Sequence, residues 1–421
     1  MTVFVLAVVA LAVLLLLALV HRWLWARLVR DTTRPGGPAR RAGTVLAFAL
    51  PVLAVTALVA GHAGAPFWLQ RAVAWPGFMW LAVLLYLTMA MLVAEPVRRL
   101  WLRRTAARTP APVPAPVPAA VSPEPGPEPS SPPGSGPEAA PAPAPVDFTR
   151  RRFVARTVGG AAAAAALATV GAGTYGVLRG PRVKRVQVPL ARLPRAAHGF
   201  RIAVVSDVHL GPILGRAHTA RIVETVNRTQ PDLIAVVGDL VDGNVHDLGP
   251  AAEPLRGLRA RHGSFFVTGN HEYFSGAQQW IDHVRELGLQ PLENARRALP
   301  YFDLAGVNDV QGEGEGHGPD FQAALGDRDR SRTAVLLAHQ PIVIHDAVRH
   351  GVDLQLSGHT HGGQLWPGNY IAELANPTVA GLERYGDTQL YVSRGAGAWG
   401  PPVRVGAPSD ITVVELASYQ A

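Results

Sequence analysis

Three long apolar runs near the start of the chain restrict its fold more than any other feature. Residues 2–20, 42–60 and 76–94 form comparable runs of 19 residues each, and about 20 apolar residues let a helix cross a bilayer. Charged segments separate the runs, and three in succession are not typical of buried helices in a soluble domain. The pattern predicts a three-span membrane region over residues 1–104, and hence a multi-pass protein of the cell membrane.

Charge is unevenly distributed along the chain, and its distribution predicts an orientation. Residues 1–180 hold 17 Arg, no Lys and 6 acidic residues, a net charge of +11, whereas the rest has a net charge of −3. Arginines cluster in segments 22–41 and 98–108, while only Arg71 lies between the second and third runs. Because cytoplasmic loops are rich in Lys and Arg, these two segments should be cytoplasmic and the N-terminus outside. Arginines beside apolar segments also favour membrane topology over nucleic acid binding, so no nucleic acid partner is expected.

A proline-rich stretch and a fourth hydrophobic segment follow. Residues 110–145 include 15 prolines, so residues 105–148 are predicted to be a semi-rigid linker. Residues 149–180 begin with TRRRFV and continue as a Gly/Ala-rich run. This segment resembles a twin-arginine export leader, which would make the export machinery a partner, and it equally fits a plain fourth span. Either reading places the remaining chain outside the cytoplasm.

Residues 181–421 have the pattern of an α/β domain. Short β-branched runs alternate with amphipathic stretches, which is typical of buried strands connected by helices. The predicted strands are residues 201–205, 233–237, 264–267, 301–305, 334–338, 353–356, 389–392 and 411–415, and the predicted helices are 218–228, 277–287 and 342–350. The chain has no Cys, which excludes disulfides, thiolate metal sites and Cys nucleophiles.

Residue types that bind metals recur directly after these strands. A single Asp after a strand is usually a turn or capping residue, but five such placements in one domain are not explained that way. In open α/β sheets, sites lie at the carboxyl ends of strands. The residues concerned are Asp207, His209, Asp239, Asp242, Asn270, His271, His339, His359 and His361.

Oxygen and imidazole ligands without thiolate suit Mn, Fe or Zn, and a carboxylate can bridge two such ions. There are more candidate ligands here than one ion could hold, so two divalent ions are favoured. A pair of ions about 3.5 to 4 Å apart is a known clamp for phosphoryl chemistry.

Five blocks in order resemble the calcineurin-like metallophosphoesterase superfamily. They are DVH at 207–209, GDLVD at 238–242, GNHE at 269–272, His339 and GHTH at 358–361. They lie within residues 200–416, and the twin-arginine-like leader and the spelling GHTHGGQ are similar to the bacterial membrane-associated branch. The resemblance implies a sandwich of two mixed sheets flanked by helices, here preceded by transmembrane helices.

The resemblance also implies a role for each matching residue. One ion would be held by Asp207, His209, Asp239 and His361, and a second by Asp239, Asn270, His339 and His359. His271 would stabilise developing charge or protonate the leaving oxygen, and we expect Asp242 to orient it.

The expected function is therefore metal-dependent hydrolysis of a phosphoester. Members of the resembled branch suggest a phosphodiesterase acting on a phospholipid or nucleotide-lipid substrate at the outer face of the cytoplasmic membrane. The alternatives are a phosphomonoesterase, or a membrane protein whose metal-binding domain only senses a phospholipid. A nuclease would need a basic catalytic domain, which the net charge of −3 does not provide.

Overall fold

The computed structural model describes residues 2–106 and 147–419. Most of the predicted linker, residues 107–146, lies outside the described residues. The described chain forms two compact units, residues 1–47 with 87–165 and residues 48–86 with 166–421.

Long apolar helices dominate the N-terminal part of the chain. They are α1 (Thr2–Trp25), continued by the π-helix η1 (Ala26–Arg30), then α2 (Pro38–Val59), α3 (Phe67–Ala106) and α4 (Asp147–Leu178). Among the described residues, four stretches are long and apolar enough to cross a membrane, namely Leu11–Arg30, Pro38–Val59, Phe67–Arg104 and Arg150–Leu178. The three predicted runs fall in the first three helices, and the predicted fourth segment falls in α4.

An ion cluster marks the polar end of α3 within the first unit. Glu95 is buried and accepts hydrogen bonds from Arg98 at 2.7 Å and from Arg99 at 2.9 Å. Arg27 of η1 reaches the same carboxylate at 3.1 Å. Three of the arginines predicted to face the cytoplasm thus bind one buried carboxylate.

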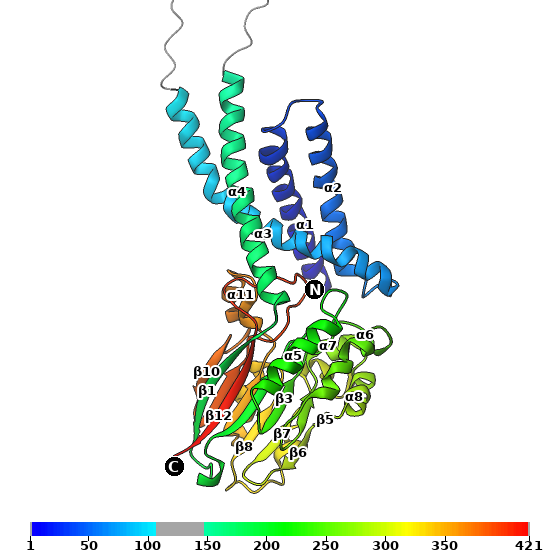
Figure 1. The fold of residues 1–421 in the computed structure, drawn as a ribbon, viewed down its shortest axis with the longest axis vertical. Helices are drawn as coiled ribbons and strands as arrows, with labels where there is room; N and C mark the ends of the chain where they lie inside the picture. Colours follow the sequence, from blue (N-terminus) through cyan, green and yellow to red (C-terminus); the bar gives the residue numbers. More distant parts are fainter. Residues whose placement is uncertain (1, 107–146, 420–421) are drawn as a thin grey trace, which may run out of the picture. The chain divides into compact units, whose positions relative to one another are not determined.

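The second unit contains two mixed six-stranded sheets (Figure 1). The first has the order β1-β12-β2-β3-β4-β5, formed by Arg182–Leu190, Asp410–Ser418, Phe200–Val205, Leu233–Val237, Ser264–Val267 and Gln290–Pro291. The second has the order β10-β11-β9-β8-β7-β6, formed by Gly381–Tyr385, Thr388–Val392, Leu354–Ser357, Ala334–Leu337, Asp303–Gly306 and Ala295–Ala298. Strands β2, β3, β4 and β5 run parallel, as do β7, β8, β9 and β11.

The alternation of side chains along the strands builds three apolar layers. Ile202 and Val204 of β2 belong to the same buried core as Val335 and Leu337 of β8. The two sheets therefore pack face to face. Ala203 and Val205 point the other way, toward helices on the outer face of the first sheet. This period of two is what a strand buried on both faces requires.

Helices cover the outer face of each sheet. The first sheet packs against α5 (Arg216–Arg228), α6 (Val245–Ala252) and α8 (Ala277–Glu286), which lie along one side in Figure 1. The second packs against α9 (Phe321–Leu325) and α10 (Ile344–Arg349). Two further short helices, α7 (Asn270–Ser275) and α11 (Gly368–Ala375), follow strand ends near the predicted ligands. The predicted fold of two mixed sheets flanked by helices, after long apolar helices, is confirmed.

Every predicted strand matches an observed one to within two or three residues at its ends.

Candidate metal centre

The strand-end loops hold their polar side chains in an unusual backbone conformation. Asp207, His209, Asp239, His359 and His361 all have φ between 49° and 74°. Residues with a Cβ rarely adopt this left-handed region, and strain of this kind is concentrated at functional sites. Five of the seven residues predicted to bind metal therefore have a strained backbone. They lie in three separate strand-end loops.

Asp207, His209 and His361 form one group of potential ligands. Each offers a ligand atom, and these atoms lie within 4.8 Å of one another. The two imidazoles approach through Nε2 at 3.0 Å, and His361 Nε2 lies 3.5 Å from Asp207 Oδ1. All three residues are buried.

A second group consists of Asp239, His339 and His359, again with ligand atoms within 4.8 Å. Asn270 joins it, because its Oδ1 lies 3.0 Å from His359 Nδ1. The Nδ1–H of His339 donates to the Val237 carbonyl at 2.9 Å. A hydrogen bond on that nitrogen fixes the tautomer and leaves the Nε2 lone pair toward the site.

Asp239 stands between the two groups. Its Oδ2 lies 3.1 Å from His339 Nε2 and 3.6 Å from His209 Nε2, so one carboxylate reaches ligands from both sides. Its other oxygen, Oδ1, accepts a hydrogen bond from the His271 amide at 2.9 Å.

Asp242 holds two imidazoles at once. Its Oδ1 is 2.7 Å from His209 Nδ1 and 2.8 Å from His271 Nδ1. The expected contact with His271 is present, and the contact with His209 was not predicted. With His209 and His271 it makes a third close group. Both histidines turn Nδ1 to the acid, so the Nε2 of His209 faces His361 and Asp239 instead.

The electrostatics divide the histidines into two pairs. Burial opposes the charged form of His209, but Asp242 and Asp239 outweigh it and raise the pKa of His209 to about 9. Burial likewise opposes charge on His339, yet Asp239 raises its pKa well above the ordinary value. Burial and the charge of His339 lower the pKa of His359 to about 4. Burial, with the charges of His209 and Arg404, lowers the pKa of His361 well below its ordinary value.

The carboxylates respond to the same charges. Burial alone would raise the pKa of Asp242, but His209 and His271 lower it to about 2. Burial raises the pKa of Asp207. A cation held beside Asp207 would favour the charged form of its carboxylate, which burial opposes.

The donor set fits a pair of divalent cations. Asp207 Oδ2 and His339 Nε2 are buried and have no hydrogen-bond partner. His339 Nε2 lies near Asp239 Oδ2, but the contact lacks the geometry of a hydrogen bond. Buried polar atoms without partners are rare, and these two are a carboxylate oxygen and an imidazole nitrogen, both common metal ligands.

Two buried side chains, Glu272 and Arg404, hold the loops in place through hydrogen bonds that were not predicted from the sequence. Glu272 is fully buried and accepts hydrogen bonds from the amides of Gly269, Asp239 and Leu240 at 2.6, 3.0 and 2.7 Å. Burial and Asp239 raise its pKa to about 7. Its place beside His271 in the block GNHE was the only available signal.

Arg404 is the second such residue. It is buried, and its guanidinium donates to His361 Nδ1 and to the His361 carbonyl, both at 3.0 Å. It also donates to Gly397 at 2.7 Å and to Ala407 at 3.1 Å. Nothing in the sequence near Arg404 pointed to this position, because it lies 43 residues after His361.

A sandwich of two mixed sheets with paired His/Asp groups at the strand ends is the arrangement expected of a metallophosphoesterase domain. Comparison with known proteins agrees, since residues 200–363 match the family described as calcineurin-like phosphoesterase. An uncharacterized metallophosphoesterase of Aquifex aeolicus is 34% identical over 240 residues, covering 56% of this chain and 91% of that protein. The chain belongs to the calcineurin-like metallophosphoesterase superfamily.

Two longer relatives carry further information. A transmembrane protein with metallophosphoesterase domain from Danio rerio is 39% identical over 250 residues, covering 56% of this chain and 57% of that protein. An uncharacterized metallophosphoesterase of Helicobacter pylori J99 is 38% identical over 247 residues, covering 58% of this chain and 66% of that protein. The chain thus spans a little over half the length of the first of these relatives. Together with its candidate spans, the likeness makes this chain a membrane protein.

Proposed function

We propose that the chain is a two-metal phosphodiesterase that acts on a phospholipid or nucleotide-lipid type of substrate at the membrane surface. The observation that carries the proposal is the position of Asp239. One buried carboxylate lies 3.1 Å from a histidine of one group and 3.6 Å from a histidine of the other. A shared carboxylate of this kind is how proteins bring two cations together.

The proposed ligand set follows the two groups. Asp207, His209, Asp239 and His361 would hold one ion, and Asp239, Asn270, His339 and His359 the other. Such an ion pair, when bound, lowers the pKa of water and neutralises the charge on phosphate oxygens. The identity of the metal is left to measurement among Mn, Fe and Zn.

His271 is proposed to supply a proton to the leaving oxygen. Its Nδ1 is bonded to Asp242 at 2.8 Å, and its side chain is 16% exposed. The ring can therefore meet a substrate through Nε2 while Asp242 keeps its orientation. A leaving alkoxide is unstable without a proton, so a positioned acid of this kind speeds its departure.

Two features support a substrate at a membrane. The chain has four candidate spans among its described residues. Helix α11 buries none of its residues and exposes Tyr370, Ile371 and Leu374, the last to 88%. Exposed apolar groups of this kind commonly meet lipid or another protein. We place the catalytic domain outside the cytoplasm because of the arginine distribution around the spans, and the domain boundaries and the export leader are part of the proposal.

The test uses the purified full chain in detergent with Mn²⁺. We expect a higher kcat/KM for bis(p-nitrophenyl) phosphate than for p-nitrophenyl phosphate, and hydrolysis of a phosphodiester lipid in mixed micelles. His359→Ala should lower kcat/KM at least about 100-fold, whereas exposed His246→Ala should leave it unchanged. Preference for the monoester would make the protein a phosphomonoesterase, and binding without hydrolysis would make it a sensor.

A further inference from the structure

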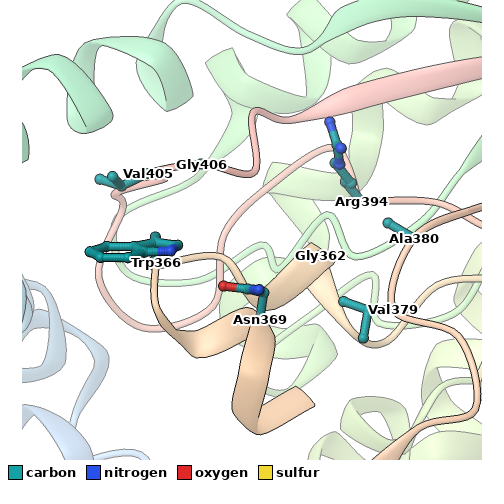
Figure 2. A pocket seen from close by; sticks show the side chains of 8 residues that line it. All are labelled: Gly362, Trp366, Asn369, Val379, Ala380, Arg394, Val405 and Gly406. Atoms are coloured by element: carbon teal, nitrogen blue, oxygen red, sulfur yellow. The ribbon is translucent and has the colours of Figure 1, made fainter. Parts of the chain in front are cut away.

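A cavity of about 300 Å³ lies beside the loop that carries His361. Gly362, Trp366, Asn369, Arg394 and Val405 are among the residues that line it. Figure 2 shows Trp366 and Arg394 on opposite sides of the cavity, with Asn369 between them. The proposed ligand set and the proposed acid do not use this cavity.

Arg394 brings a guanidinium without a hydrogen-bonded partner among the described residues to the wall of this cavity, and its charge acts on Asp410 only at longer range. It is only partly exposed, and its guanidinium forms no ion pair or hydrogen bond with any residue that the structure describes. Arg404, ten residues later, uses its guanidinium in four hydrogen bonds. A guanidinium has five N–H donors in a fixed fork that matches the oxygens of a phosphate or carboxylate. Its donors at Arg394 are therefore available to an anion.

Asn369 adds a second polar group to the same cavity. Its Oδ1 is buried and has no hydrogen-bond partner. Buried polar atoms in folded proteins are nearly always paired, so a ligand with a hydroxyl or a protonated oxygen would satisfy it. An arginine without a partner and an amide oxygen without a partner thus line one cavity.

The cavity adjoins the metal centre through two glycines. Gly362 directly follows His361, and a Cβ at Gly362 would lie 3.0 Å from Arg394 Cγ. Gly395 directly follows Arg394, and a Cβ there would lie 2.6 Å from Cβ of Asp207. Arg394 is therefore packed between the backbones that present two ligands of the first proposed ion.

We propose that this cavity binds a second anionic group of the substrate, a phosphate or carboxylate next to the diester that is cleaved. The inference rests on the proposed function and sharpens it. The substrate class becomes a phosphodiester that carries a further anion, such as a headgroup with a terminal phosphate. Trp366, which is exposed at the rim, would cover the carbon skeleton between the two anions.

The test compares two substrates with the full chain and Mn²⁺. They are the p-nitrophenyl phosphodiester of glycerol and the same diester of glycerol 3-phosphate, which differ only in the second phosphate. Arg394→Gln should lower kcat/KM for the second substrate about 10- to 100-fold more than for the first, through KM. Arg394→Lys should restore part of the difference. Arg384→Gln, which removes an exposed arginine of β10, should keep the wild-type ratio.

A binding measurement separates failure of this inference from failure of the proposed function. The metal-depleted full chain is titrated with glycerol 3-phosphate by calorimetry, and the Arg394→Gln protein should bind at least about tenfold more weakly than the Arg384→Gln protein. Equal affinities, or an unchanged substrate ratio in Arg394→Gln, would overturn the subsite. Loss of the proposed function would instead appear as hydrolysis of neither substrate by the wild-type protein, with the binding difference retained. If Arg394→Gln weakens inhibition by free inorganic phosphate equally with both substrates, and the wild-type protein prefers neither substrate, the cavity is a free-phosphate site. That result would overturn the substrate assignment.

Discussion

Glu272 joins the loops that follow β3 and β4 by a single carboxylate. It accepts the amides of Gly269, Asp239 and Leu240, all buried. Replacing Glu272 with Ala leaves three buried N–H groups without acceptors, which we expect to cost roughly 3 kcal/mol. Thermal unfolding should show a melting temperature lower by about 6–12 °C. The exposed Glu224→Ala is the control, and a wild-type melting temperature in Glu272→Ala would refute this role.

The charge state of His209 and His339 predicts how metal binding depends on pH. Both have a raised pKa in the metal-free protein, that of His209 being about 9, because neighbouring carboxylates favour the imidazolium form of each ring. An imidazolium has no lone pair for a cation, and each must lose its proton when metal binds. Apparent affinity should therefore rise with pH until the pH passes the pKa of His209.

Calorimetry in two buffers of different ionisation enthalpy measures these protons. More protons should be released per chain at pH 7 than at pH 9. A binding enthalpy that is the same in both buffers at pH 7 would show that the histidines are already neutral, contrary to this account.

The identities of the metal-binding residues were open to prediction, but the side chains that support them were not. His359 and His361 stand in a recognisable block after a strand. Arg404 has no such pattern, because its contact with His361 depends on how a distant loop folds back. Glu272 stands in the block GNHE, but its place there does not show that its carboxylate accepts hydrogen bonds from backbone amides of two loops.

The strands that were predicted are those buried on both faces, such as β3, whose five residues are all buried. The strands that were missed lie at sheet edges. β1 alternates charged and apolar residues and is largely exposed in its first half, and β10 buries none of its residues. Helix α11 also buries none of its residues, so its sequence has no core-facing stripe to identify. Edge elements are shaped by their neighbours, which a single sequence does not display.

Helix α4 reaches the metal centre through Arg404. A Cβ at Gly173 would lie 2.7 Å from Val403 Cγ1 and 2.8 Å from the Arg404 carbonyl oxygen. Gly173→Leu should push this loop away and disturb the bonds from Arg404 to His361, lowering metal affinity about tenfold. Gly171→Leu in the same helix is the matched control, because nothing lies within 4 Å of a Cβ there. Equal metal affinity in the two variants would contradict the coupling.

The side of the membrane on which the catalytic domain lies decides which phosphoesters it can reach. Arginine clusters flank the candidate spans, and they predict a catalytic domain outside the cytoplasm. A reporter that is active only outside the cytoplasm, fused after Ala421, should be active in cells. Activity of a cytoplasm-only reporter at the same position would reverse the topology and place the substrate on the inner leaflet.

The central claim is that Asp239 joins two metal ions into one hydrolytic centre. The most direct measurement is the number of ions bound per chain, determined by elemental analysis on the same samples used for hydrolysis of bis(p-nitrophenyl) phosphate. The wild-type chain should hold about two ions, and Asp239→Asn should hold fewer and lose at least about 100-fold in kcat/KM. Full hydrolysis by Asp239→Asn, or by wild-type protein stripped of metal, would contradict the account.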